Sequence, residues 1–316
     1  MPELPEVQTI SSQLQKTILN HKIRDVWSDW PKTLQVVSHQ KHLKIKKTKK
    51  NLKKEESDEI LNAFCNDIIG KKIKSVERIG KNIIINLSDN HIILVHQKLS
   101  GHLLFGRWKI KDNIPVPVIR GILDDRINKY IHLILYLSGG DMVALSDLRK
   151  FAKVISGPKD KIFSLPEISK LGPDPLEKGL TFKKFYDLIN NKKGGIKKIL
   201  LDQEVIAGIG NIYADEILWA CGVHPLTKVD DISSKKLEKM YNEMRRILRF
   251  SIKLGGDSMS DFRDIYGERG GYQNHHKAYQ RDGEPCFFCK TKIERIKIVG
   301  RSSHFCPKCQ ELKRNT

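Results

Sequence analysis

The sequence predicts an α+β protein of three parts, and three observations carry this prediction. Short β-rich runs bounded by Ser, Asn, Asp and Gly dominate up to about residue 155. Beyond about residue 175, apolar residues recur three and four positions apart, which is the period of a helix. Four cysteines in paired spacing then close the chain. At 316 residues, 39% of them hydrophobic, the chain has the length for two domains and a substantial core.

The first part is expected to be a two-sheet β domain that opens with a helix. Residues 8–19 have helical periodicity, and residues 83–87, 91–95 and 131–137 are short runs rich in β-branched residues. Strands of this kind bury their apolar faces when one sheet packs on another.

The second part is expected to be helical. A segment dense in Pro and Gly, residues 156–175, is typical of a linker that leads to it. Gly255 and Gly256 should end its last helix, and a polar, Gly-rich loop follows from Asp257 to about Gln273. The helices expected between linker and loop cover residues 182–189, 196–201, 213–220 and 236–254.

The net charge points to a polyanionic partner. The chain carries 57 Lys and Arg residues against 37 Asp and Glu residues, a formal charge of +20. Clustered cations bind backbone phosphates with release of counterions, so nucleic acid is favoured over a generally basic, solvated surface. Residues 41–54 hold eight lysines and precede a block of acidic residues. They form either a phosphate-attracting arm or a solvated insertion, and the second interpretation is slightly favoured.

Two classes of protein are excluded by the apolar pattern. No run of 18 apolar residues is present, so the sequence predicts no membrane span. Residues 1–8 contain Glu3 and Glu6 and no apolar stretch, so we expect no secretory signal. We therefore expect a cytoplasmic protein.

The C-terminal cysteines predict a metal site. In a reducing compartment, two paired knuckles spaced C-x2-C-x16-C-x2-C bind one structural zinc ion rather than form disulfides. Four thiolates complete a tetrahedral site and leave no position for water. Cys65 and Cys221 stand alone and are expected to be ordinary buried side chains. The four predicted zinc ligands are Cys286, Cys289, Cys306 and Cys309.

The N-terminus offers an unusual nucleophile. Methionine before a small residue is normally removed, which would leave Pro2 as a free secondary amine. An α-amino group has a pKa of about 7.7–8.0, so much of it is deprotonated at neutral pH and can attack a carbonyl carbon or the C1′ atom of a sugar. Glu3 beside it can donate or shuttle a proton.

Several motifs match one family of enzymes. They are Pro2-Glu3-Leu4-Pro5-Glu6-Val7, then Leu171-Gly172-Pro173-Asp174-Pro175-Leu176, the block from Ile196 to Pro225 with Gly208-Ile209-Gly210-Asn211, and Gly283-Glu284-Pro285-Cys286 with the cysteine spacing. Together they resemble the formamidopyrimidine-DNA glycosylase family of base-excision repair enzymes. The resemblance runs from residue 2 to about residue 310, and residues 41–59 lie outside it.

This resemblance implies a specific architecture. Residues 1–157 would form a catalytic β-sandwich domain with an N-terminal helix. Residues 171–282 would form a helix–two-turn–helix domain with a lesion-recognition loop, and residues 283–312 a four-cysteine zinc finger on a β-hairpin. The partner would be double-stranded damaged DNA, and the protein would act as a monomer associated with the nucleoid.

The resemblance also implies catalytic roles. Pro2 matches the Schiff-base nucleophile and Glu3 its acidic partner. Lys81 matches the lysine that contacts the phosphate beside the lesion and is assigned to β-elimination. Arg301 matches the arginine that grips the same phosphate region and is assigned to δ-elimination.

Further residues match DNA contacts of the family. Asn211 matches a phosphate ligand at a helix start, where backbone N–H groups assist. His96 and Lys193 match other positions that touch the DNA backbone. An everted nucleotide leaves a gap in the base stack, which a wedge must fill. The wedge trio of the family falls on Leu99, Arg149 and Phe151.

The sequence departs from the family around this wedge. The position of Leu99 usually holds methionine, and Tyr130 stands where a DNA-contacting histidine is common, so that contact is not expected. The alternative for Leu99 and Phe151 is ordinary packing. The other departures are Gln97, Lys98, Lys150 and Ala152.

The sequence thus predicts a bifunctional DNA glycosylase and AP lyase that removes oxidised purines (8-oxoguanine, formamidopyrimidines) through a Pro2 Schiff base and β,δ-elimination. Leu4 in place of glycine, the Arg149 and Phe151 pair, and the full loop after Gly256 resemble the oxidised-purine branch. That loop would close over the everted base, and its alternative interpretation is a disordered connector. Alternatives for the whole protein are an endonuclease-VIII-like enzyme for oxidised pyrimidines, a non-catalytic reader of damaged DNA on the same scaffold, and a basic RNA-associated zinc-finger protein.

Overall fold

The computed structural model describes residues 1–37, 53–119 and 121–312, which divide into two compact units. Met1–Ser169 and Gly255–Gly270 form the first unit, and Lys170–Leu254 with Gly271–Thr316 form the second. The loop after the last long helix thus belongs by its contacts to the N-terminal unit.

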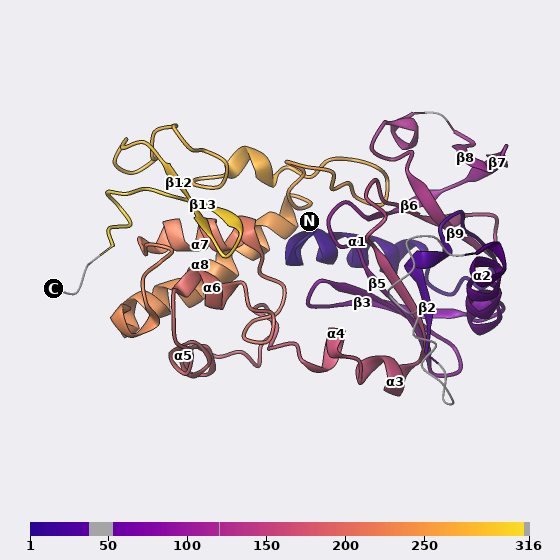
Figure 1. Ribbon diagram of the computed structural model, residues 1–316, viewed down its shortest axis with the longest axis horizontal. Coiled ribbons are helices and arrows are strands. Elements are labelled where there is room, and N and C mark those ends of the chain that lie inside the picture. Colours follow the sequence, from indigo (N-terminus) through magenta and orange to yellow (C-terminus); the bar gives the residue numbers. More distant parts are fainter. Residues whose placement is uncertain (38–52, 120, 313–316) are drawn as a thin grey trace. The chain divides into compact units, whose positions relative to one another are not determined.

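Two sheets build the described part of the first unit (Figure 1). The four-stranded sheet has the order β1 (Ile23–Trp27), β9 (Ile131–Leu137), β10 (Met142–Ser146) and β6 (His102–Gly106). The five-stranded sheet has the order β2 (Leu34–Val36), β11 (Lys153–Pro158), β5 (His91–His96), β4 (Asn82–Leu87) and β3 (Ile73–Ile79). A separate hairpin pairs β7 (Trp108–Lys111) with β8 (Ile114–Pro117). The two-sheet β domain predicted from the sequence is confirmed.

The opening helix starts earlier than its periodicity predicts. Helix α1 covers Leu4–Thr17, because proline is tolerated in a first turn and the Glu6 carboxylate accepts the Glu3 N–H at 2.7 Å. A second helix, α2 (Lys54–Ile68), was not expected and packs Phe64 and Ile68 into the core. The short elements of this unit are α3 (Lys159–Phe163), α4 (Pro166–Ser169) and the 3-10 turns η1 (Pro31–Thr33) and η2 (Ile122–Asp124).

The core explains the run of isoleucines in β4. Side chains alternate across a strand, so Ile83 and Ile85 enter the main cluster shared by both sheets, α1 and α2. Ile84 points to the other face, where it packs in a second cluster with Ile162 and Ile168 of α3 and α4. Both faces of the strand are therefore covered, which is why its apolar run is continuous.

The linker prediction for residues 156–175 is wrong in its first half. Ser156 and Gly157 belong to β11, where Gly157 has φ +154° and pairs with Ile92. Helices α3 and α4 then follow and bury their own apolar residues. Pro and Gly here end a strand and shape its close approach to β2, rather than mark a free connection.

The second unit is helical, as predicted, and closes with a β-hairpin. Its helices are α5 (Phe182–Asn190), α6 (Ile196–Leu200), α7 (Asn211–Cys221) and α8 (Ser234–Lys253), with 3-10 turns η3 (Val229–Asp231) and η4 (Tyr272–His275). Strands β12 (Glu294–Ile298) and β13 (Arg301–Phe305) form the hairpin. The Ser233 hydroxyl caps α8 by accepting the Lys236 N–H, and Gly255 with φ +77° follows its end.

Most of the lysine-rich segment 41–54 lies outside the described residues, so its two interpretations stay open. Among the residues that the structure does describe, no helix is both long and apolar enough to cross a bilayer.

Candidate DNA-binding and catalytic site

The N-terminus is held in place by one carboxylate. Pro2 and Glu3 are both buried, and Glu3 is the N-cap residue of α1. One oxygen of Glu6, Oε2, accepts the Glu3 N–H, and the other, Oε1, accepts the Asp257 N–H at 2.8 Å. Glu6 therefore joins the candidate nucleophile segment to the first residue of the loop that follows α8.

That loop is packed against the first unit. Phe262 and Ile265 lie buried in the main core, and the Ile265 carbonyl accepts the Phe105 N–H from β6 at 2.7 Å. The Ser258 hydroxyl donates to the Phe262 carbonyl at 2.9 Å and accepts the Gly270 N–H. The interpretation of the loop from Asp257 to about Gln273 as a disordered connector is therefore wrong, because two apolar anchors and a hydroxyl bridge fix it.

A partly buried imidazole lies among lysines at the end of β5. His96 pairs with Asn82 on one side and with Lys153 on the other. Burial, followed by the charges of Lys98, Lys81 and Lys153, lowers the pKa of His96 from 6.5 to about 3, so the ring is neutral. Its Nδ1 atom accepts the Lys98 N–H at 3.1 Å, which puts the ring proton on Nε2. Lysine charges beside a neutral N–H donor suit a phosphate oxygen.

The candidate wedge residues lie on two loops of the first unit. The side chain of Leu99 is 39% exposed and that of Phe151 57% exposed, so neither is an ordinary core residue. Lys98 and Lys150, next to them, have positive φ angles of 56° and 57°. Left-handed backbone in residues with a side chain is strained, and such strain collects at functional sites. Arg149 is exposed, and its N–H donates to the Ser100 hydroxyl at 3.1 Å.

The second unit carries the other candidate DNA contacts. Asn211 is the first residue of α7, and its Nδ2 donates to the Ser302 carbonyl at 2.9 Å. Arg301 begins β13, where it pairs with Ile298, and its exposed side chain makes no hydrogen bond or ion pair within the described residues. Asn211, Arg295, Arg301 and Ser302 line a polar cavity of about 550 Å³. Lys193 is exposed in the turn between α5 and α6.

The four predicted cysteines converge on one point. Their Sγ atoms all lie within 4.8 Å of one another, with 4.0 Å between Cys286 and Cys309 and 3.4 Å between Cys289 and Cys306. Sulfurs of a tetrahedral zinc site stand about 3.8 Å apart, given a Zn–S bond of about 2.3 Å, so these residues fit the ion. The Trp219 indole donates to Cys286 Sγ at 3.4 Å and so links the site to α7. These four cysteines form a structural zinc site.

The structure also reveals residues that sequence reasoning missed. Asp147 joins the two loops that carry the candidate wedge residues, through its buried carboxylate. Lys197 and Asp215 form a buried ion pair under the zinc-finger hairpin. For Asp147, the only signal in the sequence is a weak one, an Asp followed by a loop sequence. For the pair of Lys197 and Asp215 there is no local signal, because Lys197 and Lys198 are adjacent and identical in type.

Comparison with known proteins agrees with this arrangement. Residues 1–154 match the formamidopyrimidine-DNA glycosylase N-terminal domain, residues 171–263 the formamidopyrimidine-DNA glycosylase H2TH domain, and residues 283–312 the zinc finger found in FPG and IleRS. The formamidopyrimidine-DNA glycosylase of Desulfitobacterium hafniense is 31% identical over 98% of this chain and 100% of its own length.

Solved structures of DNA complexes have the same fold. One is the complex between Lactococcus lactis FPG (MutM) and a Fapy-dG-containing DNA, with a TM-score of 0.78. Another is MutM in complex with DNA that contains carbocyclic 8-oxo-G, with a TM-score of 0.79. Each is 27% identical and covers 98% of this chain and 100% of the other. The chain belongs to the formamidopyrimidine-DNA glycosylase family. It is a DNA-binding glycosylase of DNA repair that carries a zinc finger.

Proposed function

We propose that the protein excises oxidised purines, such as 8-oxoguanine and formamidopyrimidines, from duplex DNA and then cuts the strand as an AP lyase. The observation that carries this proposal is the buried Glu3 at the start of α1, directly after a proline that becomes an amine when Met1 is removed. The substrate class is supported by the two similar complexes, whose DNA contains Fapy-dG or 8-oxo-G.

The proposed chemistry begins with covalent attack. The Pro2 nitrogen bonds to C1′ while the bond from C1′ to the base breaks, and the base leaves with a proton. Glu3 protonates the ring oxygen of the sugar, and the open sugar forms an iminium with Pro2. The positive nitrogen then acidifies the C2′–H bond, and loss of that proton expels the 3′ phosphate. A second elimination, in which the C4′ proton is lost, expels the 5′ phosphate, and hydrolysis of the iminium restores the amine.

The proposed phosphate contacts support both eliminations. Lys81 and Arg301 would neutralise the charge that develops on the departing phosphates. His96 would donate from Nε2, while Asn211 and Lys193 would contact other phosphates of the strand. The wedge of Leu99, Arg149 and Phe151 would fill the space that the everted base leaves.

The loop that follows α8 is proposed to hold the everted base. Its anchors Phe262 and Ile265 are buried, whereas Met259 and Tyr266 are 42% and 46% exposed. A loop that is fixed at two points and exposed on either side of them can cover a base without moving as a whole.

The wider assignments follow from this proposal. Residues 1–157 would be the catalytic domain, residues 171–282 the helix–two-turn–helix domain and residues 283–312 the zinc finger. We propose that the enzyme acts as a monomer on double-stranded DNA at the nucleoid.

A panel of duplexes tests the proposal. Each carries 8-oxoguanine, a formamidopyrimidine, a thymine glycol or a preformed abasic site, and base release and strand cleavage are measured separately. We expect release of the two oxidised purines and cleavage at the abasic site. Release of thymine glycol alone would favour the endonuclease-VIII-like alternative, and tight binding without release would favour a non-catalytic reader. Glu3→Gln should slow base release far more than cleavage at a preformed abasic site.

A further inference from the structure

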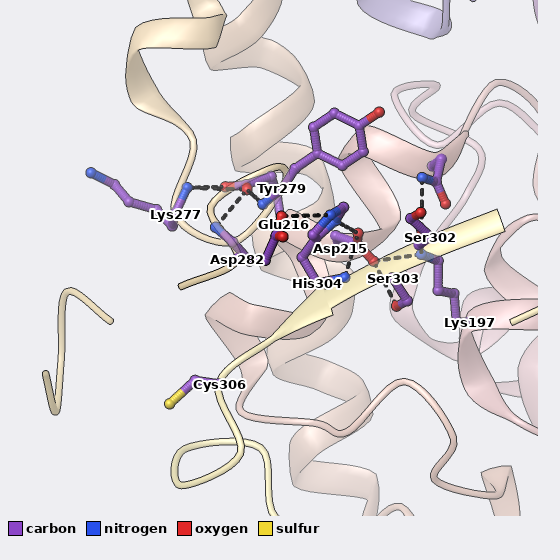
Figure 2. Close-up of polar contacts among 12 residues, drawn as sticks. Lys197, Asp215, Glu216, Lys277, Tyr279, Asp282, Ser302, Ser303, His304 and Cys306 are labelled. Carbon is purple, nitrogen blue, oxygen red and sulfur yellow. Dashed lines mark hydrogen bonds and ion pairs between the residues drawn. The ribbon is translucent and has the colours of Figure 1, made fainter. Parts of the chain in front are cut away.

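A group of polar side chains lies buried beneath the zinc-finger hairpin. Lys197 of α6 is 0% exposed and Asp215 of α7 is 1% exposed, and Lys197 Nζ lies 2.6 Å from Asp215 Oδ1 (Figure 2). Burial of two charges costs desolvation energy that a well-packed apolar pair would not. The pair is therefore not explained by its contribution to stability, and its contacts with the hairpin indicate another role.

Asp215 binds the strand that follows the hairpin turn. Its Oδ1 accepts the Ser303 hydroxyl at 3.0 Å in addition to the Lys197 ammonium. Its Oδ2 accepts the His304 N–H at 2.9 Å and lies 3.1 Å from His304 Nδ1. Figure 2 shows these side chains directed toward one another from α6, α7 and β13. One carboxylate thus fixes two successive residues of β13.

The Ser302 carbonyl connects this group to the proposed phosphate contacts. It accepts hydrogen bonds from Lys197 Nζ at 3.1 Å and from Asn211 Nδ2 at 2.9 Å. Arg301 directly precedes Ser302, and its side chain has no partner of its own in the described part of the chain. The position of Arg301 relative to Asn211 is therefore set through the main chain at Ser302.

We propose that Lys197 and Asp215 are positioning residues that hold Arg301 and Asn211 at the spacing needed to grip the DNA backbone. A carbonyl held by two donors from two helices cannot rotate, so the hairpin turn keeps its place against α7. The pair touches no substrate and acts through Ser302. The inference rests on the proposed function, in which Arg301 and Asn211 bind phosphates.

The neighbouring residue on α7 supplies a matched control. Glu216 is as buried as Asp215 and accepts the N–H groups of Lys277, Ala278 and Tyr279 (Figure 2), but within the described part of the chain it makes no hydrogen bond to β13. Asp215→Asn keeps the shape of the side chain. It replaces one carboxylate oxygen, which accepts hydrogen bonds in the unaltered protein, with an NH2 group that can only donate them. Glu216→Gln makes the same chemical change one residue away.

The first measurement is duplex binding by full-length variants with equal zinc content, at several salt concentrations. Asp215→Asn should weaken binding about tenfold and reduce the slope of log K against log salt by about 1, the signature of one lost phosphate contact. Glu216→Gln should leave the slope unchanged. Equal slopes for Asp215→Asn and the unaltered protein would overturn the proposal, whatever their stabilities.

A double-mutant cycle with Arg301→Ala separates this inference from the proposed function. If Asp215 acts by placing Arg301, Asp215→Asn should have little further effect on binding once Arg301 is alanine. Additive losses would overturn the positioning role and leave the phosphate contact of Arg301 standing. No effect of Arg301→Ala alone would overturn the assigned contact itself, and the inference with it. Should Asp215→Asn fail to fold, Ser303→Ala removes a single bond to Asp215 and should give the same pattern with about a threefold loss.

Discussion

The Ser100 hydroxyl donates a hydrogen bond to Oδ1 of Asp147 across 2.5 Å, and this contact joins two loops of the first unit. Leu99 lies directly before Ser100 on one loop. On the other, Asp147 Oδ2 accepts the N–H groups of Phe151 and Ala152, each at 2.7 Å. A buried carboxylate therefore fixes the relative position of the segments that carry the proposed wedge.

Asp147→Asn should lower both the free energy of unfolding and the affinity for damaged DNA. An amide in place of the carboxylate turns an N–H group toward backbone donors, and an unsatisfied buried donor costs about 1–3 kcal/mol. We expect that loss in the free energy of unfolding, measured by urea denaturation, together with weaker binding of a duplex that contains an abasic-site analogue. Ser100→Ala is the milder control and should cost about 1 kcal/mol. An Asp147→Asn variant as stable as the unaltered protein would contradict the role of this carboxylate.

Phe151→Ala should separate stability from activity. Because the ring is 57% exposed, its removal should change the free energy of unfolding by less than about 0.5 kcal/mol. Excision of 8-oxoguanine from a duplex should nevertheless fall about tenfold or more, since the gap in the stack stays unfilled. Leu148→Ala, an exposed apolar residue of the same loop, is the matched control and should leave excision unchanged. Equal activity of the two variants would argue against the wedge.

The loop after α8 should affect base release and not strand cleavage. Deletion of residues 259–270 would also remove Phe262 and Ile265 from the core, so a sharper change is Met259→Ala with Tyr266→Ala at its exposed positions. We expect excision of 8-oxoguanine to fall about tenfold, while cleavage at a preformed abasic site, where no base has to be held, persists. Parallel loss of both activities would remove the loop from base selection.

Local pattern predicted some of this structure and could not predict the rest. The sheets and the long helices follow from periods of two and 3.6 residues, and the zinc site from short cysteine spacings. Lys197 and Lys198 look alike in sequence, yet only Lys197 is buried, because its partner Asp215 comes from another helix. The Ser100 contact with Asp147 likewise spans 47 residues. Contacts between residues so far apart in the sequence depend on tertiary packing. The linker prediction failed for the same reason, because Gly157 and Pro158 are held in β11 by pairing with β5.

His96 should make the protein sensitive to acid. Burial and the charges of Lys98, Lys81 and Lys153 lower its folded-state pKa to about 3, whereas the unfolded value is about 6.5. As the pH falls, the unfolded chain therefore binds the proton first. The contribution of His96 to the free energy of unfolding is fully present above pH 6.5 and is lost as the pH falls toward 3. Between pH 6.5 and 5 this histidine should account for about 1.5–2 kcal/mol of that loss. Urea titrations should find a smaller loss over this range for His96→Gln, and an identical acid profile would contradict the account.

Covalent attack by the Pro2 nitrogen is tested most directly by borohydride trapping on a duplex that contains 8-oxoguanine. Reduction converts the iminium between enzyme and sugar into a stable amine, which is measured as a protein–DNA adduct. Two preparations should be compared, one with Met1 removed and one with Met1 retained, their N-termini established by mass spectrometry. We predict a strong adduct from the first and none from the second, because a proline nitrogen in a peptide bond has no free lone pair. An equal adduct yield from the protein that retains Met1 would contradict the proposed mechanism.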